Sequence, residues 1–256
     1  MNGMRRAWVL AAVAAAAWAW ASGARAEDPW TEEEPDGALW VWNAGPAWRA
    51  GVEYVRDARK ANCEGVEADW TGDTVEGVVQ WAPTAWMDLE GRVGAARGKV
   101  DFGGTGQGGM GVSWGAGLGV DVCEIAPADA AWRVFLRAEG AVKGRCGGES
   151  DGVKVGWTEY TAFVPATYQL LMERSPRSAY STDFHRLDLF AGPVWSRVEG
   201  DWECAGLKRD FEAKRELGAA VGARIWLTER VGIWGRVDIY DECGYRGGME
   251  IGRAHV

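Results

Sequence analysis

Residues 231–240 read Val231-Gly232-Ile233-Trp234-Gly235-Arg236-Val237-Asp238-Ile239-Tyr240 and alternate between apolar and polar residues. In an extended chain, Val231, Ile233, Val237 and Ile239 fall on one side, and Arg236, Asp238 and Tyr240 fall on the other. A period of two residues over such a length predicts a β-strand with one apolar and one polar face.

The same alternation recurs along the chain and predicts an all-β protein. In the preceding segment, Leu217, Val221 and Ile225 share one face and Arg224 lies on the other, and residues 228–230 join the two strands. The pattern predicts a single antiparallel up-and-down β-barrel of about ten strands, with eight or twelve as alternatives. The predicted strands are 46–57, 74–82, 86–98, 110–123, 131–143, 153–167, 186–198, 216–227, 231–241 and 245–253.

Short and long connections alternate between these strands. The short ones are 83–85, 124–130 and 228–230, and the long, glycine-rich or charged ones are 58–73, 99–109, 144–152 and 199–215. This asymmetry is typical of a transmembrane barrel with periplasmic turns and extracellular loops, and an even strand number places both chain ends on the periplasmic side. Two connections depart from it, because 168–185 is long for a turn and Cys243-Gly244 is short for a loop.

The N-terminus predicts export. Arg5 and Arg6 precede an uncharged stretch over residues 7–21, and Ala24-Arg25-Ala26 supplies a cleavage pattern of small residues. The apolar run is shorter than the ~20 residues of a membrane-spanning helix. We therefore expect a cleaved signal peptide at 1–26, an acidic periplasmic lead-in at 27–37 and the barrel at 38–256.

The tryptophans favour a barrel in lipid. The chain has 17 of them, and Trp48, Trp81, Trp86 and Trp132 lie near predicted strand ends, where they would form the aromatic girdle at the periplasmic interface. The apolar faces also run unbroken for about the length that a tilted strand needs to cross hydrocarbon. A soluble exported β-sandwich or β-barrel would show a similar alternation and stays open as an alternative.

The signal peptide, the alternation over about ten residues and the short-turn, long-loop asymmetry resemble the small bacterial outer-membrane β-barrels, the class of OmpA-like, OmpX-like and omptin-like proteins. The resemblance covers residues 38–256 and implies an outer-membrane location, contact with outer-membrane lipid and lipopolysaccharide, and insertion by the barrel-assembly machinery. Members of this class usually end in an aromatic residue, commonly Phe, whereas this sequence ends in Val256.

The predicted inward faces carry charges of both signs. In a ring of eight to ten strands the interior is only wide enough for side chains, so we expect these charges to pair and to plug the lumen. The alternative is a narrow ion-conducting path or transporter. The predicted lumen residues are Arg49, Glu53, Glu76, Asp88, Glu90, Arg92, Arg133, Arg137, Glu139, Asp188, Arg224, Arg236, Asp238, Arg246 and Glu250.

Five cysteines would enter an oxidising compartment, where disulfides form. Cys63, Cys146, Cys204 and Cys243 fall in predicted outer loops, and barrel closure brings the first and last loops together. We therefore expect the bridges Cys63–Cys243 and Cys146–Cys204, with Cys123 free. Spacing of the CxxC or CxxH type does not occur, so a metal site is not expected.

The sequence predicts no enzyme and no cofactor. Beyond the signal peptide the histidines are His185 and His255, both on the predicted periplasmic side and without a triad pattern beside them. The glycine-rich run 103–109 lacks the Lys-Ser/Thr of a phosphate-binding loop, and the charged stretch 205–216 is expected to be a solvated loop.

A net charge of −9 argues against nucleic acid as a partner. We therefore expect a non-enzymatic outer-membrane protein with a structural or surface-binding role, for which the extracellular ligand is unknown. An outer-rim hydrolase stays as a further alternative.

Overall fold

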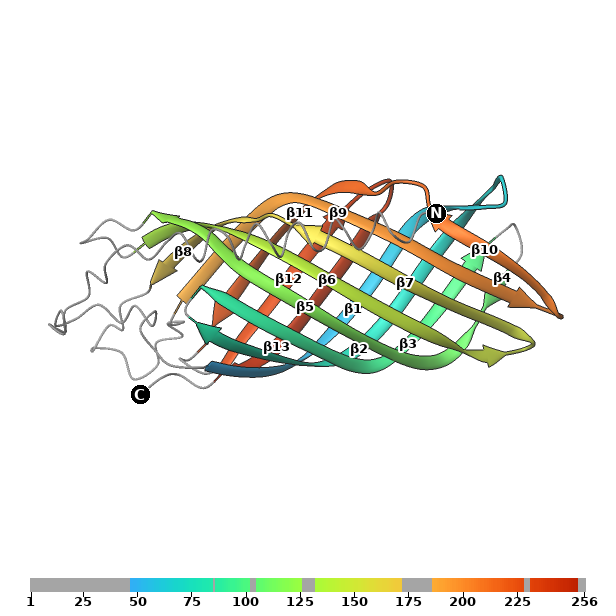
Figure 1. The fold of residues 1–256 in the computed structure, drawn as a ribbon, viewed down its shortest axis with the longest axis horizontal. Helices are drawn as coiled ribbons and strands as arrows, with labels where there is room; N and C mark the ends of the chain where they lie inside the picture. Colours follow the sequence, from blue (N-terminus) through green and yellow to red (C-terminus); the bar gives the residue numbers. More distant parts are fainter. Residues whose placement is uncertain are drawn as a thin grey trace, which may run out of the picture. The chain divides into compact units, whose positions relative to one another are not determined.

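The computed structural model describes residues 47–84, 86–101, 105–125, 132–171, 186–227 and 231–252, all within one compact unit. They form a single antiparallel sheet of thirteen strands (Figure 1). The strands are β1 (Ala47–Cys63), β2 (Val66–Thr84), β3 (Met87–Asp101), β4 (Thr105–Gln107), β5 (Gly109–Ile125), β6 (Trp132–Ser150), β7 (Val153–Phe163), β8 (Ala166–Leu171), β9 (Arg186–Cys204), β10 (Leu207–Ala213), β11 (Leu217–Trp226), β12 (Val231–Ile239) and β13 (Cys243–Gly252).

The sheet closes on itself to form a barrel. β1 pairs with β2 on one side and with β13 on the other, as in Arg49↔Gln80 and Arg49↔Gly252. β4 with β5, β7 with β8 and β10 with β11 each occupy one position in the ring, so thirteen strands minus three give ten positions. The all-β, antiparallel ring of about ten strands predicted from the alternation is confirmed.

The breaks within ring positions have local causes. Between β7 and β8 lie Val164 and Pro165, and a proline has no backbone N–H to donate to the ladder. This segment still accepts a backbone hydrogen bond from a neighbouring strand, since the Arg137 N–H donates to the Pro165 carbonyl at 3.0 Å. The unusual length of the predicted 168–185 connection is explained in part, because residues 168–171 are strand and belong to β8.

Three of the four predicted long loops are wrong. Residues 58–73, 144–152 and 199–215 are mostly strand, and two-residue turns join β1 to β2, β6 to β7 and β9 to β10. The residues of each turn have positive φ, the backbone of a type I′ hairpin turn, which matches the twist of the flanking strands. The turns are Glu64-Gly65, Asp151-Gly152 and Ala205-Gly206.

The described parts of the other predicted loops are also ordered in the sheet. In the glycine-rich run, residues 105–107 form β4 against β3, with Val100 opposite Gly106. The charged 205–216 stretch contains β10, which pairs with β9 through Phe211 opposite Gly200.

The ring narrows towards the end that holds these hairpin turns. β12 stops at Ile239 and β13 begins at Cys243, whereas β10 continues and pairs directly with β1 through Ala61 opposite Ala213. The ring therefore loses two strands. We call this narrower part, residues 56–73, 97–101, 105–108, 146–158 and 197–213, the crown. Figure 1 shows β4 and β10 at this end and β8 at the other. The opposite end, with Ala47 and Gly252, is the terminal end.

The outward face is apolar below the crown. There the strands alternate between exposed and less accessible residues, and Val52, Val93 and Val221 are among the exposed ones. We call this surface the belt. Its described outward positions carry only apolar, aromatic, glycine or proline residues; they lie in 48–54, 75–81, 87–95, 112–120, 134–144, 160–170, 187–195, 217–225, 231–239 and 245–251.

In the crown the pattern inverts. On β9 the outward residues change from Leu189 and Trp195 in the belt to Arg197 and Glu203 in the crown. The inward residues change in the opposite sense, from charged at the level of the belt to apolar in the crown, beyond Asp57 and Arg59 at its base. The crown is thus built as a water-soluble β-barrel is built, with its apolar side chains inside.

Several predicted features lie outside the described residues. These are the signal peptide, the lead-in and the first barrel residues at 1–46, and also His185, His255 and Val256. Within the described residues, no helix is both long and apolar enough to cross a membrane.

Candidate functional site

The lumen of the barrel holds the candidate site. All the charges predicted to face inward lie at inward positions of the strands, and they fall into two groups along the barrel. One group occupies the middle, from below the crown up to its base, where Asp57 and Arg59 lie, and the other lies towards the terminal end. An apolar core inside the crown lies above them.

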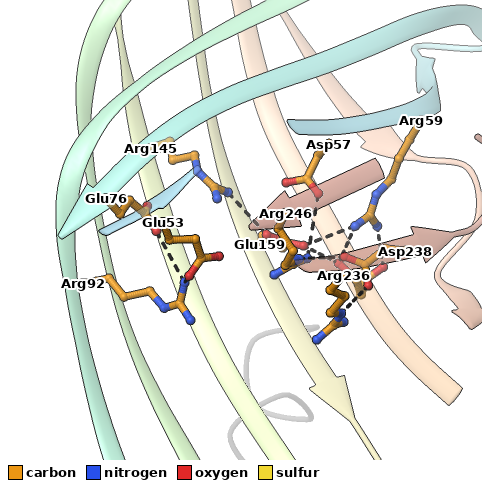
Figure 2. A network of polar contacts seen from close by, with 11 residues as sticks. Glu53, Asp57, Arg59, Glu76, Arg92, Arg145, Glu159, Arg236, Asp238 and Arg246 are labelled. Carbon is orange, nitrogen blue, oxygen red and sulfur yellow. Dashed lines mark hydrogen bonds and ion pairs between the residues drawn. The ribbon is translucent and has the colours of Figure 1, made fainter. Parts of the chain in front are cut away.

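Glu159 of β7 is the centre of the first middle cluster. It is fully buried and accepts hydrogen bonds from Arg59 at 3.2 Å and from Arg145 at 3.3 Å (Figure 2). The Ser196 hydroxyl donates a third hydrogen bond to it at 2.8 Å. Arg59 lies on β1 and Ser196 on β9, so this carboxylate joins three parts of the ring. The Arg59 guanidinium also lies 3.9 Å from the centre of the Tyr240 ring. Such charge-assisted bonds are stronger than neutral ones.

Asp238 of β12 is the centre of the second middle cluster. Arg236 donates to one of its oxygens at 2.6 Å and Arg246 donates to the other at 2.7 Å. Arg246 also makes an ion pair with Asp57 at 3.9 Å, which connects β13 to β1. Arg236 also stacks over Phe163, with its guanidinium 3.9 Å from the ring centre. This guanidinium therefore makes an ion pair through its charge and a cation–π contact through its flat face.

Arg92 of β3 is the centre of the third. Its guanidinium makes ion pairs with Glu53 and, at 3.8 Å, with Glu76 (Figure 2). A third ion pair joins it to Glu90. Glu90 also accepts a hydrogen bond from Gln80 at 2.9 Å. Glu53 and Glu76 are directly opposite each other in the sheet, an arrangement that is destabilising for like charges without a shared cation.

The middle of the lumen is balanced in charge. It contains six basic and six acidic side chains, which are Arg59, Arg92, Lys143, Arg145, Arg236 and Arg246 against Glu53, Asp57, Glu76, Glu90, Glu159 and Asp238. A selective ion path would carry one dominant sign of charge along its wall. Here each of the five arginines instead makes an ion pair with a carboxylate, as buried ions need in a low-dielectric interior. The buried Lys143 ammonium, by contrast, has no hydrogen-bond acceptor within reach among the described residues.

A further network fills the terminal end. Arg137 pairs with Asp88, with Asp121 at 2.8 Å and with Glu139 at 3.0 Å. The other contacts are Arg133–Glu124 at 2.9 Å, Gln169–Asp188 at 2.7 Å, Arg186–Asp188 at 3.0 Å and Arg224–Glu250 at 2.9 Å. Arg49 lies 5.6 Å from the centre of the Trp226 ring.

The apolar core closes the lumen inside the crown. Trp70 on β2 meets Trp157 on β7 with ring centres 5.5 Å apart, and Phe211 on β10 lies 6.2 Å from Trp70. These strands are not neighbours in the ring, so their side chains touch across the lumen. The core residues are Ala61, Cys63, Ala68, Trp70, Ala96, Val100, Val153, Val155, Trp157, Val198 and Phe211.

Glycines leave room for this core. A Cβ atom at Gly98 would lie 2.7 Å from both the Trp157 ring and a Val155 methyl, and one at Gly72 would lie 2.8 Å from the same Trp157 ring. These distances are too short for any real side chain, so the Trp157 ring fits only because both positions lack a Cβ atom.

Sequence reasoning missed several members of the middle clusters. Arg59 fell in a predicted loop, whereas Asp57, Lys143 and Glu159 lay on or at the ends of predicted strands and were not selected. Parity was the available signal, because 57 and 59 share the inward phase of Arg49 and Glu53 on one continuous strand.

The predicted interface tryptophans all lie at the terminal end with exposed side chains. Trp48 stacks on Trp81 with ring centres 5.7 Å apart and an interplanar angle of 19°. Trp132 stacks on Tyr168 at 6.1 Å, and Trp86 is 39% exposed beside the β2–β3 turn.

The predicted disulfides are absent, since all five cysteines are free thiols. The reason is the facing of the side chains. Cys63 and Cys204 face inward and pack in or against the crown core, whereas Cys146 and Cys243 are exposed on the outer face. Each predicted bridge would join an inward to an outward residue through the wall. Cys123, which was expected to be free, is exposed near the β5–β6 connection.

The described residues contain no cluster of three or more potential metal ligands among their His, Cys, Asp and Glu side chains. The charged side chains that are gathered in the lumen are arranged mainly as ion pairs between arginines and carboxylates. This chemistry holds strands together and fills space.

Comparisons with known proteins add little at the level of sequence. No family model matches the chain, and no curated protein is significantly similar to it. Among solved structures, the chain is similar to the transport unit of the autotransporter AIDA-I from Escherichia coli, with 9% identity and a TM-score of 0.39 over 86% of this chain and 93% of that one.

Two further solved structures were found. The β domain of the Bordetella autotransporter BrkA has 12% identity and a TM-score of 0.36, over 81% of this chain and 98% of that one. The translocator domain of the autotransporter NalP from Neisseria meningitidis has 10% identity and a TM-score of 0.31, over 86% and 89%.

The class of fold is therefore defined by the strand pairing, as a closed antiparallel barrel of ten strand positions. The three solved structures named above are domains of autotransporters, and none of them is an OmpA-like, OmpX-like or omptin-like protein.

Proposed function

We propose that this chain is a bacterial outer-membrane β-barrel that is anchored by its belt, closed along its lumen, and presents the crown outside the cell. The observation that carries the proposal is the sharp change of the outward face from the apolar belt to the charged crown on strands such as β1, β2, β3 and β9. A soluble barrel would gain nothing from exposing Val52, Val93 and Val221 to water.

The height of the belt supports a membrane position. β12 contributes nine residues to it, and nine residues at ~3.3 Å, tilted by about 40°, span roughly 23 Å along the barrel axis. Outer-membrane barrels have an apolar band about 25 Å tall. The exposed tryptophans at the terminal end would then lie at the periplasmic interface.

The orientation follows from the even number of strand positions. Ala47 and Gly252 both lie at the terminal end, and in this class of barrel the chain ends face the periplasm. The crown would then project from the outer surface. Export through the signal peptide at 1–26 and insertion by the barrel-assembly machinery belong to the same proposal.

The lumen favours a structural or surface-binding role over transport. The apolar core of the crown and the balanced ion pairs below it leave the interior occupied by side chains. We therefore propose no catalytic role and no cofactor, and we place any binding activity on the outside of the crown. A narrow pore is the competing function, because the lumen does carry many charges.

Planar-bilayer recording of the purified full chain separates the two functions. We expect no steady conductance. Heat-modifiable migration in detergent gels verifies insertion in the same preparation. A known porin added to the same membrane serves as the positive control. Steady ohmic channels from the wild-type protein would replace the closed-barrel proposal by the pore. Fractionation with soluble periplasmic contents, without a heat-modifiable form, would remove the membrane location itself.

A further inference from the structure

A row of three charged residues crosses the outer face at the level where the belt ends. Arg56 on β1 is the register partner of Asp73 on β2, and Asp73 is the register partner of Arg97 on β3. All three side chains point outward, and the two arginines are 46% and 45% exposed. The row therefore presents two guanidinium groups to the surroundings of the barrel.

The two arginines share one carboxylate. Each has a guanidinium nitrogen 3.7 Å from an Asp73 oxygen, which is ion-pair distance but longer than a hydrogen bond. Asp73 already accepts a hydrogen bond from the Tyr54 hydroxyl at 2.8 Å. The row thus carries a net charge of +1, and its guanidinium forks keep donor capacity for an anion.

The surroundings place this row at the rim of the belt. Two residues towards the terminal end lie Tyr54 and its register partner Val75, and the Tyr54 ring is 6.0 Å from that of Tyr245. Towards the crown tip lie Thr71 and its register partner Lys99. Aromatic residues next to the apolar band mark the level of lipid headgroups.

Other basic residues at the same rim are already compensated. Arg197 faces three carboxylates, with Glu199 at 2.6 Å, Glu216 at 3.6 Å and Glu212 at 3.8 Å. Lys60 pairs with Asp69 and, at 3.5 Å, with Glu242. The row from Arg56 to Arg97 differs from both, because its basic groups outnumber its carboxylates.

We propose that Arg56 and Arg97 bind the phosphate of an anionic lipid headgroup in the leaflet around the crown, with Lys99 and Thr71 next to it. The chemistry is charge-assisted hydrogen bonding from guanidinium forks to phosphate oxygens, for which arginine is well suited. Asp73 holds the two forks apart and sets their spacing. The site rests on the proposed membrane location, since the acyl chains of the lipid would lie along the belt.

The test compares thermal unfolding of the full chain in vesicles of phosphatidylcholine, with and without phosphatidylglycerol. Binding to the folded state stabilises it, so we expect phosphatidylglycerol to raise the wild-type midpoint by a few degrees. In the double variant Arg56→Gln/Arg97→Gln, this increase should fall to less than half. The matched control, Lys208→Gln/Arg209→Gln, removes the same charge near the crown tip and should keep the full increase.

A second variant works in the opposite direction. Asp73→Asn removes the competing carboxylate and should enlarge the increase that phosphatidylglycerol produces. Inorganic phosphate added to phosphatidylcholine vesicles should not reproduce it, and an equal effect would overturn the lipid as the source of the phosphate.

The remaining outcomes separate this site from the proposed function. The site is overturned if the arginine variant keeps the full increase, or if the control loses as much. Wild-type protein that enters both vesicles without any effect of phosphatidylglycerol also overturns the site alone. Failure to enter either vesicle overturns the membrane location and the site together.

Discussion

Replacement of Glu159 by glutamine tests whether the lumen clusters hold the barrel together. Glutamine keeps the size of the side chain but removes its charge, and it leaves Arg59 and Arg145 without their shared anion. Glu159 is 0% exposed and accepts three hydrogen bonds, at 3.2, 2.8 and 3.3 Å. Two of these come from charged donors, and hydrogen bonds to charged groups contribute ~1.5–3 kcal/mol each.

The expected loss is about 3–5 kcal/mol in the free energy of unfolding, which is typical when one partner of a buried ion pair is removed. Whole domains are stable by only ~5–15 kcal/mol, so the variant should unfold at clearly lower urea concentration. The assay is urea unfolding in phospholipid vesicles, followed by tryptophan fluorescence.

Glu212→Gln is the matched control for this experiment. Glu212 lies on the outside of the crown, is 65% exposed, and approaches Arg197 only to 3.8 Å. Its replacement should change stability by less than ~0.5 kcal/mol. A Glu159→Gln variant within about 1 kcal/mol of the wild type would refute the view that this buried carboxylate holds strands together.

Three further predictions test the belt, the crown core and the thiols. Val221→Arg places a charge in the middle of the belt and should cost ~2–4 kcal/mol in vesicles, whereas Val66→Arg at the exposed tip of the crown should be nearly neutral, both by urea unfolding. Gly98→Val should overpack Trp157 and lower stability by ~1–3 kcal/mol, seen as a lower thermal midpoint. Burial raises the pKa of Cys63 from 9.0 to about 11, so its thiolate fraction at pH 8 is about a hundredfold smaller. Maleimide labelling with mass spectrometry of the folded protein should therefore modify the exposed cysteines and spare this one.

The sequence was most informative where one face of a strand is lipid-like and the other is charged. Val231 to Ile239 is such a strand, and its bounds were predicted within two residues. Alternation of this kind requires only the period of an extended chain, so it needs no knowledge of neighbouring strands.

The crown was misread because its pattern is inverted and diluted. Residues 58–73 carry mostly charged or polar residues outside and mostly small or aromatic residues inside. Because this is the reverse of the belt pattern, the segment resembled a polar loop. The role of Trp70 in the core depends on its contact with Trp157, which lies 87 positions further along the chain and meets it across the lumen. Contacts of this kind depend on barrel closure, which no local pattern reports.

The disulfide prediction failed for a related reason. It took Cys63 and Cys243 as neighbours because their strands are adjacent, which is true of β1 and β13. Two residues on adjacent strands need not have their side chains on the same face of the sheet. Because side chains alternate along a strand, a shift of one residue moves a side chain to the opposite side of the barrel wall.

The tight turns of the crown affect how easily a protease can cleave the chain. A protease must draw several residues of extended, unpaired backbone into its cleft, and exposed flexible loop tips are the usual places where it finds them. At Glu64-Gly65, Asp151-Gly152 and Ala205-Gly206 only two residues separate paired strands. Cleavage there would first require the hairpin to unzip against its neighbours, so these hairpins should stay intact under digestion.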